Sequence, residues 1–143
     1  MEKKKSAQFL SEVSLFTGMK QRSLLALADR LIEREFHAGE RIIEQGKEGF
    51  GLFIIVSGHA EVRFANENGK TNVVNELEQG DFFGEMSLLD DQPRSASVYA
   101  TTDTLCLFLN RIDFVACMMN DAEMGLFVST ELARRLRRSL ASK

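Results

Sequence analysis

The chain has 143 residues, enough for one domain with a sizeable core, and its 44% hydrophobic and 27% charged residues are an ordinary globular balance. The formal net charge of -3 argues against a surface built as a whole to bind nucleic acid.

No apolar run reaches about 18 residues, so no transmembrane helix is expected. The basic start of the chain is not followed by the apolar segment of a signal peptide. Cys106 and Cys117 form no C-x-x-C pair and lie in apolar sequence, which favours buried thiols in a reducing compartment. We therefore expect a cytoplasmic location.

The first part of the chain, residues 1–30, has a helical pattern. A short helix is predicted over residues 6–16, with Gly18 as the break after it. Further along, apolar residues recur at helical spacing and give one apolar face: Leu24, Leu25, Leu27, Ala28 and Leu31.

Between residues 31 and 110, short β-rich runs alternate with glycine and Asn-Gly turn signals. Strands at intervals of about 8–12 residues are typical of a β-sandwich or barrel. Asn68-Gly69 predicts a hairpin turn in which both central residues take positive φ. Helical spacing then returns over residues 111–120 and 121–140.

The predicted fold class is mainly β with flanking helices: a β-roll, or double-stranded β-helix (jelly-roll), barrel between N-terminal and C-terminal helices. We expect a single domain over residues 1–143, with N-terminal helices in about 1–30, the barrel in 31–110 and C-terminal helices in 111–143.

The segment 82–98, FFGEMSLLDDQPRSASV, has the residues of an anion site. Gly84 lets the backbone approach a ligand closely. A helical turn in the middle of the segment would point the N–H groups of Met86 and Ser87 toward negative charge. Arg94 adds a planar guanidinium suited to bidentate contact with a phosphate. Two small residues follow and leave their backbone N–H groups open to the same anion: Ser95 and Ala96.

Glu85 conflicts with a simple anion site because like charges repel. An ionised carboxylate accepts hydrogen bonds, so Glu85 would suit a hydroxyl of the ligand while an arginine balances its charge. A 3′,5′-cyclic nucleotide carries one such hydroxyl, the ribose 2′-OH, close to its phosphate. The alternative is that Glu85 and Arg94 are only a structural ion pair between two β-elements.

The segment resembles the phosphate-binding cassette of the cyclic nucleotide-binding domain family, which includes protein kinase A regulatory subunits, bacterial catabolite activator proteins and cyclic-nucleotide-gated channels. The family pattern is F-G-E-hydrophobic-small-L, a variable loop, and P-R-small-A-[ST]-V, and it is met at residues 83–88 and 93–98. The resemblance extends over nearly the whole chain through the glycine-marked runs upstream and the helices downstream.

The resemblance implies a role for each residue that matches the motif. Glu85 would accept from the 2′-OH, Arg94 would pair with the cyclic phosphate, and the backbones of Ser87 and Ser95 would donate to phosphate oxygens. The whole set of ligand-binding residues expected in this way is Phe83, Gly84, Glu85, Met86, Ser87, Arg94, Ser95, Ala96, Val62, Val74 and Ser139.

The base end of the ligand is less specified. Val62 and Val74, on adjoining strands, are expected to offer apolar surface to the sugar and base, and Ser139 to come near the base as the C-terminal helix closes the pocket. In the family, the residue after the cassette arginine influences the choice of base. Ser95 occupies that place and is intermediate between the residues typical of each base. We expect cyclic AMP rather than cyclic GMP.

The predicted function is therefore a non-catalytic sensor, because the chain offers no nucleophile with an orienting base and no metal cluster. No cofactor or metal, no direct contact with nucleic acid and no membrane contact are expected. An unknown downstream effector would read the signal, and a homodimer through the C-terminal helix is one option. The sequence leaves open whether the chain is a free-standing sensor or an excised domain.

Two other functions are weighed against the sensor. A cupin-like metal enzyme shares the barrel outline, but it usually needs clustered histidines and a carboxylate, and this chain has only His37 and His59. An interaction domain that keeps the fold with a vestigial pocket is the other alternative.

Overall fold

The computed structural model describes residues 1–85 and 94–141. The chain divides into two compact units. One is Met1–Arg30 together with Asp113–Lys143, and the other is Leu31–Ile112.

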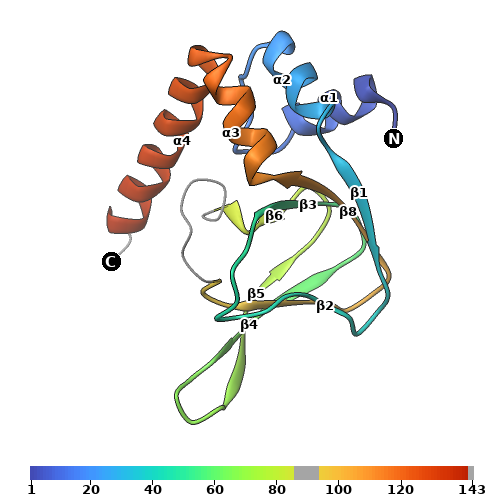
Figure 1. Ribbon diagram of the computed structural model, residues 1–143. Helices are drawn as coiled ribbons and strands as arrows, with labels where there is room; N and C mark the ends of the chain where they lie inside the picture. The colour runs from blue at the N-terminus through green and yellow to red at the C-terminus, as the bar shows by residue number, and fades with distance from the viewer. Residues whose placement is uncertain (86–93, 142–143) are drawn as a thin grey trace. The chain divides into compact units, whose positions relative to one another are not determined.

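The unit Leu31–Ile112 consists of two four-stranded antiparallel sheets, with strand orders β1-β8-β3-β6 and β2-β7-β4-β5 (Figure 1). Successive strands alternate between the sheets except at the β4–β5 hairpin, which is the jelly-roll arrangement. The strands are β1 (Ile32–Phe36), β2 (Arg41–Ile43), β3 (Gly51–Ser57), β4 (Ala60–Ala65), β5 (Thr71–Leu77), β6 (Phe82–Phe83), β7 (Ser97–Ala100) and β8 (Thr104–Asn110).

The predicted fold class is confirmed, with one difference. Within the described residues, no hydrogen-bonded ladder joins the two sheets into a closed barrel. Strands β5 and β6 are each the last strand of their sheet, so the roll has open edges there.

The core between the sheets anchors both ends of the segment 82–98. Phe83 of β6 stacks on Phe53 of β3 with ring centroids 5.2 Å apart, and Phe108 lies 4.7 Å from Phe53. Val98 of β7 is in the same cluster and is 2% exposed. Since burying a phenylalanine contributes about 1.5–3 kcal/mol, these anchors fix where the segment leaves and rejoins the sheets.

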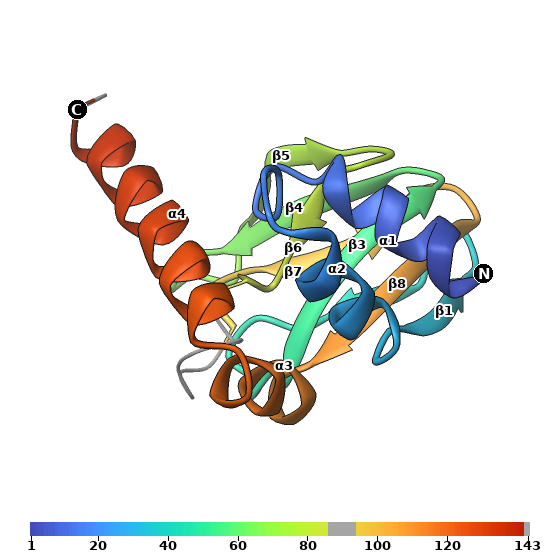
Figure 2. The same cartoon turned by 90° about the horizontal axis from the view of Figure 1, so that it is seen from above.

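The helices are α1 (Lys3–Ser11), α2 (Gln21–Ala28), α3 (Arg111–Met119) and α4 (Ala122–Ala141), and α4 is the long C-terminal helix in Figure 2. The helix predicted over residues 6–16 is wrong in its C-terminal half, because α1 ends at Ser11. Leu15 and Phe16 are buried, at 1% and 0% exposed, in the turns that follow α1. Their burial overrides the local helical preference. Among the described residues, no helix has the length and apolar character needed to cross a membrane.

Asp121 caps the first turn of α4. Its carboxylate accepts from the backbone N–H of Met124 at 3.2 Å and from the hydroxyl of Ser23, on α2, at 2.6 Å. These hydrogen bonds, with the Ser23 bond the larger contribution, hold the pKa of Asp121 below its ordinary value.

The β4–β5 hairpin is confirmed, but its turn differs from the predicted one. Gly69 has φ +78, whereas no residue other than glycine in the described ranges has positive φ, so Asn68 does not take the predicted conformation. The carboxamide oxygen of Asn66 instead accepts from the N–H groups of Asn68 and Lys70, both at 3.0 Å. This side-chain cap favours a longer loop with a single left-handed glycine.

Candidate functional site

Arg94 is the best-defined residue of the candidate site. It is 8% exposed, and its backbone is held by the adjoining loop, with its N–H donating to the Lys47 carbonyl and its carbonyl accepting from the Gly46 N–H, both at 2.8 Å. The guanidinium donates from Nη1 to the carbonyl of Gly84 at 3.1 Å and from Nη2 to the carbonyl of Gly51 at 3.0 Å. Two backbone oxygens from different strand ends therefore fix the direction of the guanidinium.

The conformation of Gly84 is one that side chains rarely allow. Its φ is +82, and a Cβ there would overlap Nη1 of Arg94 and lie 2.9 Å from the carbonyl oxygen of Gly51. Only glycine brings the backbone this close to the guanidinium without strain. The sequence predicted a close backbone approach at Gly84, and the group that approaches in this structure is the arginine.

The electrostatics of the site come from a buried cation with a carboxylate near it. Burial lowers the pKa of the Arg94 guanidinium, and Glu85 acts in the opposite direction by raising it. An arginine nevertheless remains charged at neutral pH. Glu85 directly follows Gly84 and is half-buried. A desolvated positive charge with a hydrogen-bond acceptor nearby suits a small anion that also carries a hydroxyl group.

Of the other predicted cassette residues, Phe83, Ser95 and Ala96 lie within the described residues. Phe83 is 5% exposed and packs in the core, so its side chain supports the site from behind. Ser95 is exposed and Ala96 is half-buried, directly after Arg94. The predicted donors Met86 and Ser87 lie outside the described residues.

Val62 and Val74 lie on paired strands, as expected, but they are not opposite each other. Val62 pairs with Asn75, and the register shifts between Val62 and Arg63, which leaves Val74 at the irregularity. Val62 is half-buried against the core, whereas Val74 is 59% exposed. The structure therefore does not bring these two valines into one apolar wall.

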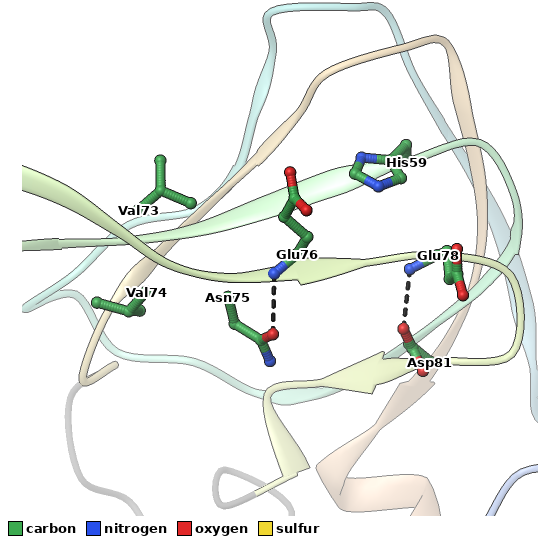
Figure 3. Close-up of a pocket in the computed structure, with 7 residues that line it drawn as sticks. All are labelled: His59, Val73, Val74, Asn75, Glu76, Glu78 and Asp81. Carbon is green, nitrogen blue, oxygen red and sulfur yellow. Dashed lines mark hydrogen bonds between the residues drawn. The ribbon is translucent and has the colours of Figure 1, made fainter.

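Val74 instead lines a cavity of about 570 Å³ along β5 and the turn after it (Figure 3). The residues around it are His59, Val73, Val74, Asn75, Glu76, Glu78 and Asp81. The carboxylates in this set would repel a phosphate, so the cavity does not suit the anionic end of a ligand. This cavity is not predicted from the sequence, because residues from separate parts of the chain, His59 and 73–81, line it together.

Ser139 lies on α4, in the helical unit, and is exposed.

Within the described residues, no group of three or more His, Cys, Asp or Glu side chains is arranged to hold a metal ion. The two histidines have different polar partners. His37 Nδ1 is 3.9 Å from the carboxylate of Asp103, and His59 Nδ1 is 3.0 Å from the hydroxyl of Thr101.

Sequence reasoning missed the backbone groups that hold Arg94. Upstream of residue 82 the glycines are interpreted as turn signals, and this interpretation predicts no role for the carbonyl of Gly51. One feature of the sequence could have indicated this contact: Gly51 is the first residue of β3, and Gly49 precedes it by two residues. Glycines so close to a buried strand indicate close packing as well as a turn.

Comparison with known proteins shows the family of the chain. Residues 33–121 match the family model of the cyclic nucleotide-binding domain. The chain belongs to the cyclic nucleotide-binding domain family. The domain is 42% identical over 97 residues to the cAMP-dependent protein kinase regulatory subunit of Mycosarcoma maydis, covering 68% of this chain and 18% of that protein. It is 33% identical over 120 residues to a cGMP-dependent protein kinase of Eimeria tenella, covering 84% of this chain and 11% of that protein.

Among solved structures, the domain is similar to the regulatory subunit of a cAMP-independent protein kinase A from Trypanosoma cruzi bound to guanosine. The two are 38% identical with a TM-score of 0.74, over 81% of this chain and 42% of that chain. This cyclic nucleotide-binding domain thus spans less than a fifth of the two kinase relatives and under half of the solved chain.

Proposed function

We propose that this domain binds a purine 3′,5′-cyclic nucleotide through the cassette 82–98. Arg94 pairs with the cyclic phosphate, Glu85 accepts from the ribose 2′-OH, and the backbones of Ser87 and Ser95 donate to phosphate oxygens. The observation that carries the proposal is the buried guanidinium of Arg94, held in a fixed direction by two backbone carbonyls.

The physical reason is that a buried charge is costly unless an interaction offsets its desolvation. Glu85 raises the pKa of Arg94 against the effect of burial. A cyclic phosphate supplies a full negative charge with paired oxygens, which matches the guanidinium fork. The ligand would therefore stabilise the site that the fold has built.

The remaining predicted contacts belong to the same proposal. Gly84, Met86 and Ala96 bring backbone close to the sugar and phosphate, and Phe83 supports them from the core. At the base end, Val62, Val74 and Ser139 stay proposed contacts. Cyclic AMP is proposed in preference to cyclic GMP, with Ser95 intermediate between the family's two patterns. The exposure of Val74 is compatible with a ligand surface at this strand.

As a module, the domain acts as a non-catalytic sensor in the cytoplasm. Residues 1–143 form one such module, whose C-terminal helices shift when the ligand binds and whose movement is read by an effector protein. Differential affinity of the ligand for the two helix positions supplies the signal. A homodimer through α4 is part of the proposal, because Leu136 and Leu140 are 61% and 60% exposed on that helix.

A second candidate function is an interaction domain that responds to no cyclic nucleotide. A specific observation favours it: the similar Trypanosoma cruzi structure is of a cAMP-independent kinase subunit and holds guanosine, a nucleoside without a phosphate. The two candidates differ in whether Arg94 binds the phosphate of a ligand.

Competitive titration separates the two. The assay compares cyclic AMP, cyclic GMP, 2′-deoxy cyclic AMP and guanosine against a fluorescent cyclic AMP analogue. Cyclic AMP is expected to compete most strongly, and the deoxy analogue at least tenfold less, since a hydrogen bond to a charged group contributes about 1.5–3 kcal/mol. Equal competition by the deoxy analogue removes Glu85 from its role. If the fluorescent analogue itself does not bind, calorimetric titration with guanosine tests the second candidate, which predicts binding of guanosine and of no cyclic nucleotide.

A further inference from the structure

Gly49 lies against the side chain of Arg94. A Cβ built on Gly49 would overlap Nε and Cζ of the arginine and come within 2.6 Å of Nη2. Real side chains do not approach so closely, so an alanine at position 49 and the present position of Arg94 exclude each other. The guanidinium occupies the space that a side chain at position 49 would fill.

Gly49 does not need to be glycine for its own backbone. It is absent from the glycines of the described residues that have positive φ. Its φ therefore lies outside the left-handed region that disfavours alanine. The three atoms nearest to a methyl group at this position all belong to the side chain of Arg94.

The other two glycines around the guanidinium are different. Gly84 has φ +82, so any side chain there strains the backbone as well as meeting Arg94. A Cβ on Gly51 would overlap the carbonyl oxygen of Leu109 and lie 2.8 Å from two ring carbons of Phe108. Substitution at either position disturbs the strand ends directly. At Gly49, by contrast, the three atoms nearest to an added methyl group all belong to Arg94, so this position suits a test of that contact.

We propose that Gly49 is a positioning residue of the phosphate site. By lacking a side chain, it leaves the space in which the guanidinium lies and donates to the carbonyls of Gly51 and Gly84. This inference rests on the proposed function, since it assigns Gly49 to the same ligand. Gly49 touches the arginine and needs no contact with the nucleotide.

The Gly49→Ala variant tests the proposal by its affinity for cyclic AMP. Because the methyl group displaces the guanidinium, the dissociation constant is expected to rise at least tenfold, approaching that of Arg94→Ala. The matched control is Gly39→Ala, at a glycine with φ +91 and nothing within 4 Å of a built Cβ. The control is expected to lose thermal stability through backbone strain and keep the parent affinity.

A double-mutant cycle without ligand distinguishes positioning from a general structural role. Gly49→Ala is expected to lower the melting temperature of the parent, where Arg94 must move, and not that of Arg94→Ala, where the space is empty. Equal losses in both backgrounds, or parent affinity for cyclic AMP in Gly49→Ala, would overturn the inference. If the parent domain itself does not bind cyclic AMP, the proposed function fails, and the melting cycle still shows whether Gly49 and Arg94 are coupled.

Discussion

Replacing Arg94 with alanine is expected to weaken binding of cyclic AMP by roughly tenfold to a hundredfold or more. The estimate follows from the geometry: the guanidinium is 8% exposed and points in a direction set by two carbonyls, so its bonds to a phosphate form in a desolvated site. A hydrogen bond to a charged group contributes about 1.5–3 kcal/mol, and about 1.4 kcal/mol is a factor of ten in affinity.

Isothermal titration calorimetry with the parent and Arg94→Ala measures this change. Arg94→Lys should also lose at least tenfold, because an ammonium group cannot span both carbonyls and a phosphate as a planar fork does. The matched control is Arg63→Ala, which removes an arginine that pairs with Glu61 at 2.9 Å and stacks on Tyr99. The control should bind within about twofold of the parent, because it removes the same charge from a side chain outside the cassette.

Two results would refute the reasoning. Parent affinity in Arg94→Ala would mean that the cassette arginine does not hold the phosphate. An equal loss in Arg63→Ala would mean that the effect is one of overall charge. Melting of the unliganded variants checks the fold: losing the bonds to Gly51 and Gly84 is offset by removing a buried charge, so the shift in melting temperature should be small.

Three further predictions follow from other residues. Glu85→Gln should weaken cyclic AMP about tenfold and leave the 2′-deoxy analogue unchanged, which competition measures; an equal loss for both ligands contradicts the 2′-OH contact. The lowered pKa of Asp121 stabilises the fold above the ordinary carboxyl pKa of about 3.9, and this stability is lost as pH falls through the lowered folded value. The melting difference between the parent and Asp121→Asn should therefore shrink below about pH 4, and a constant difference from neutral to acid pH would rule this out. Burial raises the pKa of Cys106 to about 12, so in a Cys117→Ser background this thiol should react with an alkylating reagent at pH 8 only after denaturation; rapid labelling of the native protein is the opposing result.

The sequence was most informative where short motifs coincide with local physical requirements. The alternation of β-rich runs and glycine turns predicted the strand region between residues 31 and 110, and the strands run from Ile32 to Asn110. The cassette pattern identified the family, and it placed Arg94 and Glu85 between the two strands β6 and β7.

Other features depend on tertiary contacts that a local pattern does not contain. α1 ends at Ser11, and Leu15 and Phe16 are buried in the turns that follow it, which a helical pattern alone does not reveal. The turn at Gly69 is set by the side chain of Asn66. The environment of Arg94 required knowledge of which carbonyls and which glycine lie next to the guanidinium once the strands have paired.

The central claim is that the guanidinium of Arg94 holds the phosphate of a cyclic nucleotide. The most direct test is nuclear magnetic resonance of the arginine side-chain N–H groups in the domain labelled with ¹⁵N-arginine, with the Arg94 signal assigned from Arg94→Lys. On saturation with cyclic AMP, the Arg94 signal is expected to shift strongly while that of Arg63 stays in place. An Arg94 signal that does not move at saturation would contradict the claim.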